Sequence, residues 1–125
     1  MKVLQAIAGA DYGGAEEFFV RLAIALEKSE IQQRAVIRWN KNRSERLREG
    51  GVETVELGFG SRLDVATRWK LKRQIDEFDP DIVLTWMNRA TLIFPPRGNF
   101  IRVGRLGGYY NLKYYRHCDH LVANT

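Results

Sequence analysis

Three glycines, Gly9, Gly13 and Gly14, lie between a short apolar run and an amphipathic stretch. Glycine lets the backbone approach a ligand closely, and the first N–H groups of a helix carry the positive end of its dipole. The spacing matches neither the dinucleotide fingerprint nor the P-loop. These residues therefore predict an anion site without naming the anion. Asp11, between Gly9 and Gly13, could orient a ligand hydroxyl or act as a base, or only bond its own backbone.

A second group of polar residues falls in a segment without acidic side chains, Ile82–Cys118. Asn88 and Arg89 directly follow an apolar run, and Arg105 lies near the end of another. We expect these three to contact a phosphate or another polar ligand, and Tyr109 to offer an aromatic face for stacking. The alternative interpretation is a helix cap, exposed arginines and a buried tyrosine.

Composition limits the class of protein. The chain has 125 residues, 45% hydrophobic and 28% charged, which is typical of one globular domain with a core. No apolar run approaches the ~20 residues that span a bilayer, and the opening residues break too soon for a signal peptide. A single cysteine, Cys118, excludes an internal disulfide framework and fits a reducing compartment. We therefore expect a cytoplasmic protein.

The net charge of +5 is typical of a surface that meets anions, including an anionic membrane. No nucleic-acid module is recognisable, so we expect no nucleic-acid partner. The segment His117–His120 holds two histidines, a cysteine and an aspartate, but adjacent residues rarely share one tetrahedral ion. We interpret it as a helix-to-strand junction and expect no metal.

Hydrophobic periodicity predicts the elements that position these residues. Expected strands are Lys2–Ala8, Gln33–Trp39, Val52–Leu57, Asp81–Trp86, Phe100–Leu106 and His120–Asn124. Expected helices are Ala15–Ser29, Ser44–Glu49 (capped by Asn42 or Ser44), Arg62–Phe78, Asn88–Phe94 (capped by Asn88) and Leu112–Cys118. The inner face of the first helix is predicted to hold Ala15, Phe18, Phe19, Leu22, Ala23 and Leu26. That of the third is predicted to hold Leu63, Ala66, Trp69, Ile75 and Phe78.

Strands and helices alternate along the whole chain. Such alternation predicts an α/β fold, a Rossmann-like doubly wound parallel sheet of about six strands with helices on both faces. Ligands of such sheets bind beyond the carboxyl ends of the strands, where the strand order reverses. The switch is expected between the first and fourth strands. Asp11, Asn88, Arg89 and Arg105 should then converge on one crevice.

Three motifs in order resemble the GT-B glycosyltransferases of the GT4-type group. They are Gly-Gly-Ala-Glu at Gly13–Glu16, Asp-Pro-Asp followed by apolar residues at Asp79–Thr85, and the terminal Cys118–Thr125. The resemblance covers essentially the whole chain. It implies an N-terminal Rossmann-like, acceptor-side domain, in which Asn88, Arg89, Arg105 and Tyr109 are candidates to bind the acceptor or a phosphate, with Tyr109 stacking on a sugar face. It also implies that a second domain binds most of a nucleotide-sugar donor, and that Gly13 and Gly14 contact the donor diphosphate and sugar. Glu16 matches the motif, but we first assign it a role at the helix start.

Two departures from that family matter. The chain stops at Thr125, so residues 1–125 are expected to be an incomplete domain that is inactive without the donor-binding domain. No histidine follows the fifth strand, where Arg105 stands instead, so the resemblance assigns no catalytic residue and leaves Asp11 a weak candidate.

The expected whole enzyme moves a hexose from a nucleotide sugar to a glycan or glycolipid of the cell surface, without a metal or other cofactor. The alternatives are a stand-alone nucleotide- or anion-binding module without catalysis, and a self-associating scaffold.

Overall fold

The computed structural model describes residues 1–9, 13–60, 64–106 and 112–123. Within them, six parallel strands form one sheet in the order β3-β2-β1-β4-β5-β6. The strands are β1 (Lys2–Ile7), β2 (Gln32–Arg38), β3 (Glu53–Leu57), β4 (Ile82–Trp86), β5 (Ile101–Leu106) and β6 (His120–Ala123). The helices are α1 (Gly14–Leu26), α2 (Lys41–Glu49), α3 (Val65–Phe78) and α4 (Met87–Ile93), followed by the 3-10 turn η1 (Leu112–Tyr115).

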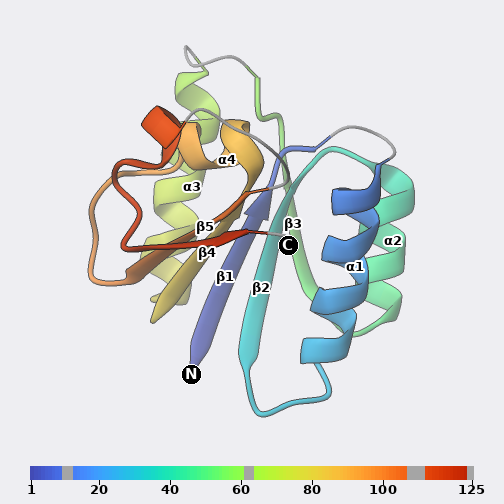
Figure 1. The fold of residues 1–125 in the computed structure, drawn as a ribbon. Helices are drawn as coiled ribbons and strands as arrows, with labels where there is room; N and C mark the ends of the chain where they lie inside the picture. The colour runs from blue at the N-terminus through green and yellow to red at the C-terminus, as the bar shows by residue number, and fades with distance from the viewer. Residues whose placement is uncertain (10–12, 61–63, 107–111, 124–125) are drawn as a thin grey trace.

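The predicted α/β fold class is confirmed, including the change of direction between β1 and β4. Helices α1 and α2 lie on one side of the sheet, on the right in Figure 1, and α3 and α4 lie on the other. The central strand β1 is buried over almost its whole length, as expected for a parallel strand covered on both faces.

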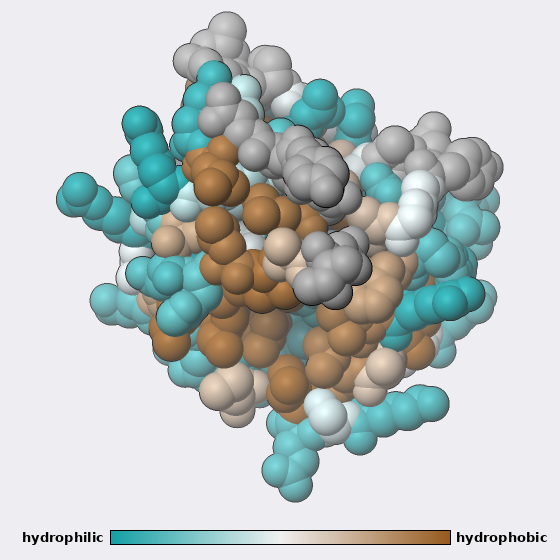
Figure 2. All heavy atoms as spheres, viewed as in Figure 1, coloured by the Kyte–Doolittle hydropathy of each residue, from teal (hydrophilic) through white to brown (hydrophobic). Residues whose placement is uncertain are grey.

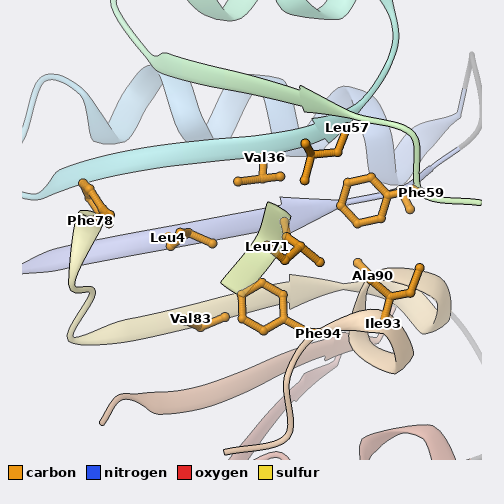
Figure 3. Packing of buried hydrophobic residues seen from close by; sticks show 12 residues of the cluster. Leu4, Val36, Leu57, Phe59, Leu71, Phe78, Val83, Ala90, Ile93 and Phe94 are labelled. Atoms are coloured by element: carbon orange, nitrogen blue, oxygen red, sulfur yellow. The ribbon is translucent and has the colours of Figure 1, made fainter. Parts of the chain in front are cut away.

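The core on the α3 side centres on Leu71. Figure 3 shows this fully buried leucine among Leu4 of β1, Phe59 after β3 and Phe94 after α4. The cluster contains side chains from four strands, β1, β2, β3 and β4, and from the connections that follow β3 and α4. This packing fixes how the end of β3 and the segment after α4 sit relative to the central strands.

The core on the α1 side is built around Trp86. Phe19 of α1 contacts its ring edge to face, with ring centroids 5.3 Å apart. The Trp86 Nε1–H donates to Gln5 Oε1 at 2.9 Å, and Gln5 Nε2 donates to Gln33 Oε1 at 3.0 Å. Gln33 in turn donates to the carbonyl of Ala23. A buried polar chain therefore ties β4, β1 and β2 to α1.

The β5–β6 end of the sheet is less completely covered. Ile101 and Val122 share the face of Arg105 and are each 47% exposed. Figure 2, viewed as in Figure 1, shows hydrophobic side chains gathered across the middle of one side of the molecule, with hydrophilic ones around them.

Several predicted details of the helices are wrong. Trp69 is not on the inner face of α3 but 60% exposed, and Thr67 and Leu71 are buried instead. The reason is the start of the helix: Asp64 accepts from the Thr67 backbone N–H at 3.0 Å, and the Phe59 backbone N–H donates to Thr67 Oγ1 at 3.1 Å. These bonds turn Thr67 inward and Trp69 outward.

Predictions for α1 and α2 are also wrong in detail. Phe18, predicted to be buried, is 46% exposed, and Val20 is buried in its place. Helix α2 begins at Lys41 rather than Ser44, because Asn40 is its cap: Asn40 Oδ1 accepts from the backbone N–H of Arg43 at 2.9 Å. The helix is therefore about a turn longer than its hydrophobic pattern indicated.

Candidate functional site

A crevice of about 340 Å³ opens where the strand order changes direction. It is lined by Ala8, Gly9, Glu16, Arg38, Trp86, Met87, Asn88 and Arg89, and we name it the switch crevice. As expected, Asn88 and Arg89 meet the loop after β1 here. Two predicted site residues, Asp11 and Tyr109, lie outside the described residues.

Glu16 lies in the first turn of α1, as predicted. The sequence did not predict that the residue is only 8% exposed and that its side chain lies against Gly9 and Gly13. A methyl group at Gly9 would come within 2.5, 2.6 and 2.9 Å of Glu16 Oε1, Cγ and Cδ. A methyl group at Gly13 would likewise collide with Glu16 Oε2. Gly9 and Gly13 therefore leave room for the Glu16 carboxylate.

Gly14 differs from the other two glycines. It is the first residue of α1, and no atom of the described residues lies within 4 Å of a methyl group placed on it. Its backbone is exposed to solvent at the positive end of the helix dipole. The described part of the domain thus gives no packing reason for a glycine at this position.

The turn from β4 into α4 carries backbone strain. Met87 has φ 65°, a left-handed conformation that a non-glycine residue seldom adopts. The expectation that Asn88 caps the helix is wrong, because Asn88 lies inside the first turn of α4. Its Oδ1 instead accepts a hydrogen bond of 2.8 Å from the Tyr115 hydroxyl. The strained turn brings the residue pair Asn88 and Arg89 to the crevice.

Two exposed arginines give the switch crevice positive charge. Arg89 was a predicted site residue, whereas sequence reasoning missed Arg38. Its position in the sequence could have predicted it, because Arg38 is the last residue of β2, which pairs with β1 and ends at the same edge of the sheet. With the α1 dipole nearby, the rim favours an anionic ligand.

Arg105 lies beside this crevice but is not among its lining residues. The prediction that Arg105 converges on the crevice is therefore wrong: it pairs with Trp86 in the β4–β5 register and is only 9% exposed. Its guanidinium carbon lies 4.5 Å from the Trp86 ring centroid and 4.8 Å from that of Phe18. Arg105 therefore stacks on two aromatic rings behind the crevice wall.

A second cavity, of about 470 Å³, lies between α1 and α2. This α1–α2 cavity is lined by Gly13, Glu16, Glu17, Val20, Asn40, Lys41, Asn42, Arg43 and Arg46. Glu17 accepts two hydrogen bonds from Arg46, of 2.7 and 2.9 Å, which clamp the two helices together. The Arg46 guanidinium lowers the pKa of Glu17 to about 2. Because Glu16 lines both spaces, the α1–α2 cavity adjoins the switch crevice.

The segment around Cys118 is a helix-to-strand junction, as predicted. The Asp119 backbone N–H donates to the Arg102 carbonyl at 2.7 Å, and the Arg102 N–H donates to Asp119 Oδ2 at 2.8 Å. Burial raises the pKa of the Cys118 thiol. In the described ranges no three His, Cys, Asp or Glu side chains form a metal-binding group, and no helix there is long and apolar enough to cross a bilayer.

Comparison with known proteins gives relatives of one kind. The chain is 35% identical, over 129 residues, to the lipopolysaccharide core biosynthesis glycosyltransferase LpsD of Rhizobium meliloti (strain 1021). It is 34% identical, over 128 residues, to the lipopolysaccharide core biosynthesis glycosyltransferase LpsE of the same organism. Both alignments cover the whole chain but only 37% of each relative, so the chain spans little more than a third of their length. No protein-family model matches the chain.

Among solved structures, a glycosyltransferase from Rickettsia africae ESF-5 superposes with a TM-score of 0.74 at 18% identity. The match covers 98% of this chain and 36% of that one. Structural similarity at such a low sequence identity establishes a shared fold and nothing more. The chain is thus a relative of lipopolysaccharide core glycosyltransferases, with the fold of the N-terminal domain of a GT-B glycosyltransferase.

Proposed function

We propose that the protein to which this chain belongs transfers a sugar from a nucleotide-sugar donor to a lipopolysaccharide core acceptor. Residues 1–125 would form its acceptor-side domain, with a further domain supplying most of the donor site. The observation that carries this proposal is the switch crevice, which joins the glycine loop, Asn88 and two arginines in a chain related to such transferases.

In this proposal the α1 terminus faces the donor. Gly13 and Gly14 would contact the donor diphosphate and sugar, and the open space around Gly14 supports close backbone approach. Asn88 and Arg89 would bind the acceptor or a phosphate, together with Arg38. Arg105 would act behind them as a positioning residue, by holding the Trp86 ring that lines the crevice.

Asp11 and Tyr109 follow the first and fifth strands in the sequence and lie outside the described residues. We propose Asp11 as the base or acceptor-orienting group, and Tyr109 as a face for stacking a sugar.

The wider setting follows from the proposed substrates. The transferred sugar would be a hexose, and no metal ion would be required. Because the relatives belong to lipopolysaccharide core biosynthesis, we propose a cytoplasmic site of action, at the inner face of the membrane. The net charge of +5 would favour contact with anionic lipid. Residues 1–125 alone would provide one wall of the cleft and would not catalyse transfer.

The test is a transfer assay on the complete polypeptide that carries this chain, with common nucleotide sugars and lipopolysaccharide core acceptors. We expect transfer, and we expect Arg89→Ala to lower it strongly. Arg97→Ala is the matched control, because Arg97 is also an exposed arginine but lines a different cavity. Absence of both transfer and donor hydrolysis would rule out the proposal, and equal effects of the two substitutions would remove Arg89 from the site.

A stand-alone nucleotide- or anion-binding module is the second candidate. One observation favours it: Arg38, Asn88 and Arg89 already surround the crevice without another domain. Titration of residues 1–125 with nucleoside diphosphates separates the two candidates. Submicromolar binding would favour the module, since half of a cleft binds weakly.

A further inference from the structure

An exposed tryptophan lies at the far end of a row of cavities. Trp39 directly follows β2 and is 68% exposed, although it is one of the largest apolar side chains. Its backbone N–H donates to the Leu57 carbonyl at 3.1 Å, which fixes its place at the carboxyl edge of the sheet. The tip of the indole, Cη2, lies 3.9 Å from a methyl group built at Gly58, so the ring rests near the chain that leaves β3.

A groove of about 470 Å³ runs beside this ring. We name it the Trp39 groove. Apart from Trp39, its lining side chains are all polar or charged: Asn40, Lys41, Ser44, Glu45, Arg48 and Glu56. An exposed aromatic face beside carboxylates and a guanidinium suits a sugar ring, whose C–H face packs on indole while its hydroxyls bond planar polar groups.

Ser44 supplies an independent sign of a missing partner. The residue is 2% exposed and lines the groove, yet its Oγ has no hydrogen-bond partner among the described residues. A buried hydroxyl is nearly always hydrogen-bonded, because leaving it unpaired costs about 1–3 kcal/mol. Because the Oγ itself is buried, the Ser44 side chain would have to rotate toward the groove for a ligand hydroxyl to satisfy it.

The Trp39 groove and the switch crevice, where the reaction centre is proposed, are the two ends of a row of three spaces that share lining residues. Asn40 and Lys41 line both this groove and the α1–α2 cavity. Glu16 in turn lines both the α1–α2 cavity and the switch crevice. The three spaces therefore lie next to one another in a row, from the switch crevice through the α1–α2 cavity to the Trp39 groove, and we name this row the track.

We infer that this track binds an oligosaccharide acceptor several sugars long, and that Trp39 stacks on a sugar remote from the one that reacts. This inference rests on the proposed function for the identity of the reacting end. It adds that the acceptor is recognised by its length, through the Trp39 groove, and not by its terminal sugar alone.

The test measures saccharide binding and needs no transfer, so its failure is separable from that of the proposed function. Residues 1–125, labelled with ¹⁵N, are titrated with core oligosaccharide released from Rhizobium meliloti lipopolysaccharide, and separately with its constituent monosaccharides. The three tryptophan indole N–H signals are followed by NMR. Trp69 is the internal control, because it is 60% exposed on α3 but lines none of the three cavities.

We expect the Trp39 signal to move with the oligosaccharide, the Trp69 signal to stay, and the monosaccharides to give little change. Trp39→Ala should raise the dissociation constant about ten-fold, and Trp69→Ala should leave it unchanged. Ser44→Ala should weaken binding without lowering the unfolding midpoint. The inference is overturned if the Trp39 signal does not move, if both signals move equally, or if monosaccharides bind as well as the oligosaccharide.

Discussion

The loop after β1 offers a test in which neighbouring glycines respond in opposite ways. Gly9→Ala places a methyl group 2.5–2.9 Å from Oε1, Cγ and Cδ of the buried Glu16. The carboxylate must leave its position or the loop must shift, and overpacking of this kind costs about 1–3 kcal/mol. Gly14→Ala meets no described atom and replaces glycine at a helix start. It should therefore leave stability unchanged or raise it by up to about 1 kcal/mol.

Urea denaturation of the 125-residue chain, followed by circular dichroism, measures both effects. With a slope of about 2 kcal/mol/M, a 2 kcal/mol loss in Gly9→Ala lowers the midpoint by about 1 M urea. The control is the same pair of substitutions in a Glu16→Ala background, where the side chain that collides is absent. There the Gly9→Ala penalty should fall below about 0.5 kcal/mol, because the two residues are coupled by contact. An equal penalty in both backgrounds would refute the role given to Glu16. A large penalty for Gly14→Ala would refute the open space at that position.

Three further substitutions test the two cores and the helix clamp. Arg46 holds the pKa of Glu17 at about 2, below its ordinary 4.5, so the clamp contributes above about pH 4.5 and is lost as pH falls through 2. The stability gap between wild type and Glu17→Gln should therefore close between pH 4.5 and 2 in urea titrations, and a gap unchanged at pH 2 would contradict this assignment. Trp86→Phe leaves Gln5 Oε1 buried without its indole donor and should lower the free energy of unfolding by about 1–3 kcal/mol; no measurable loss would mean that water replaces the donor. Leu71→Ala should destabilise the chain by about 2–5 kcal/mol in thermal unfolding, because Leu71 is fully buried at the centre of the α3-side core.

Helix α3 shows why some details could not be predicted from the sequence. Its sequence allows two inner stripes, one containing Trp69 and one containing Leu71, and hydrophobicity alone favoured the tryptophan. The structure selects the other stripe because Asp64 caps the helix and Thr67 turns inward to accept from Phe59. A polar residue that is buried by a specific hydrogen bond has no signature in a hydrophobic pattern.

The candidate site shows the same division. Asn88 and Arg89 were predicted to reach the crevice from their place just after an apolar strand, and they do line it. Arg38 and Glu16 were missed as crevice residues, since one looked like an exposed strand end and the other like an ordinary acidic residue in a first helical turn. Arg38 reaches the crevice because β2 lies beside β1, and Glu16 reaches it because its side chain packs against Gly9 and Gly13. Neither arrangement can be read from the local sequence.

The sequence by itself determined the alternation of strands and helices, and with it the parallel sheet and the edge at which ligands bind. It could do so because burial on one or both faces leaves a local period in the chain. Only the tertiary structure decided that Glu16 lies beneath Gly9 and Gly13, that Arg105 stacks on Trp86, and that the switch crevice, the α1–α2 cavity and the Trp39 groove share lining residues. These contacts join residues whose partners are fixed by strand order and helix rotation, and such long-range geometry leaves no period in the sequence to read.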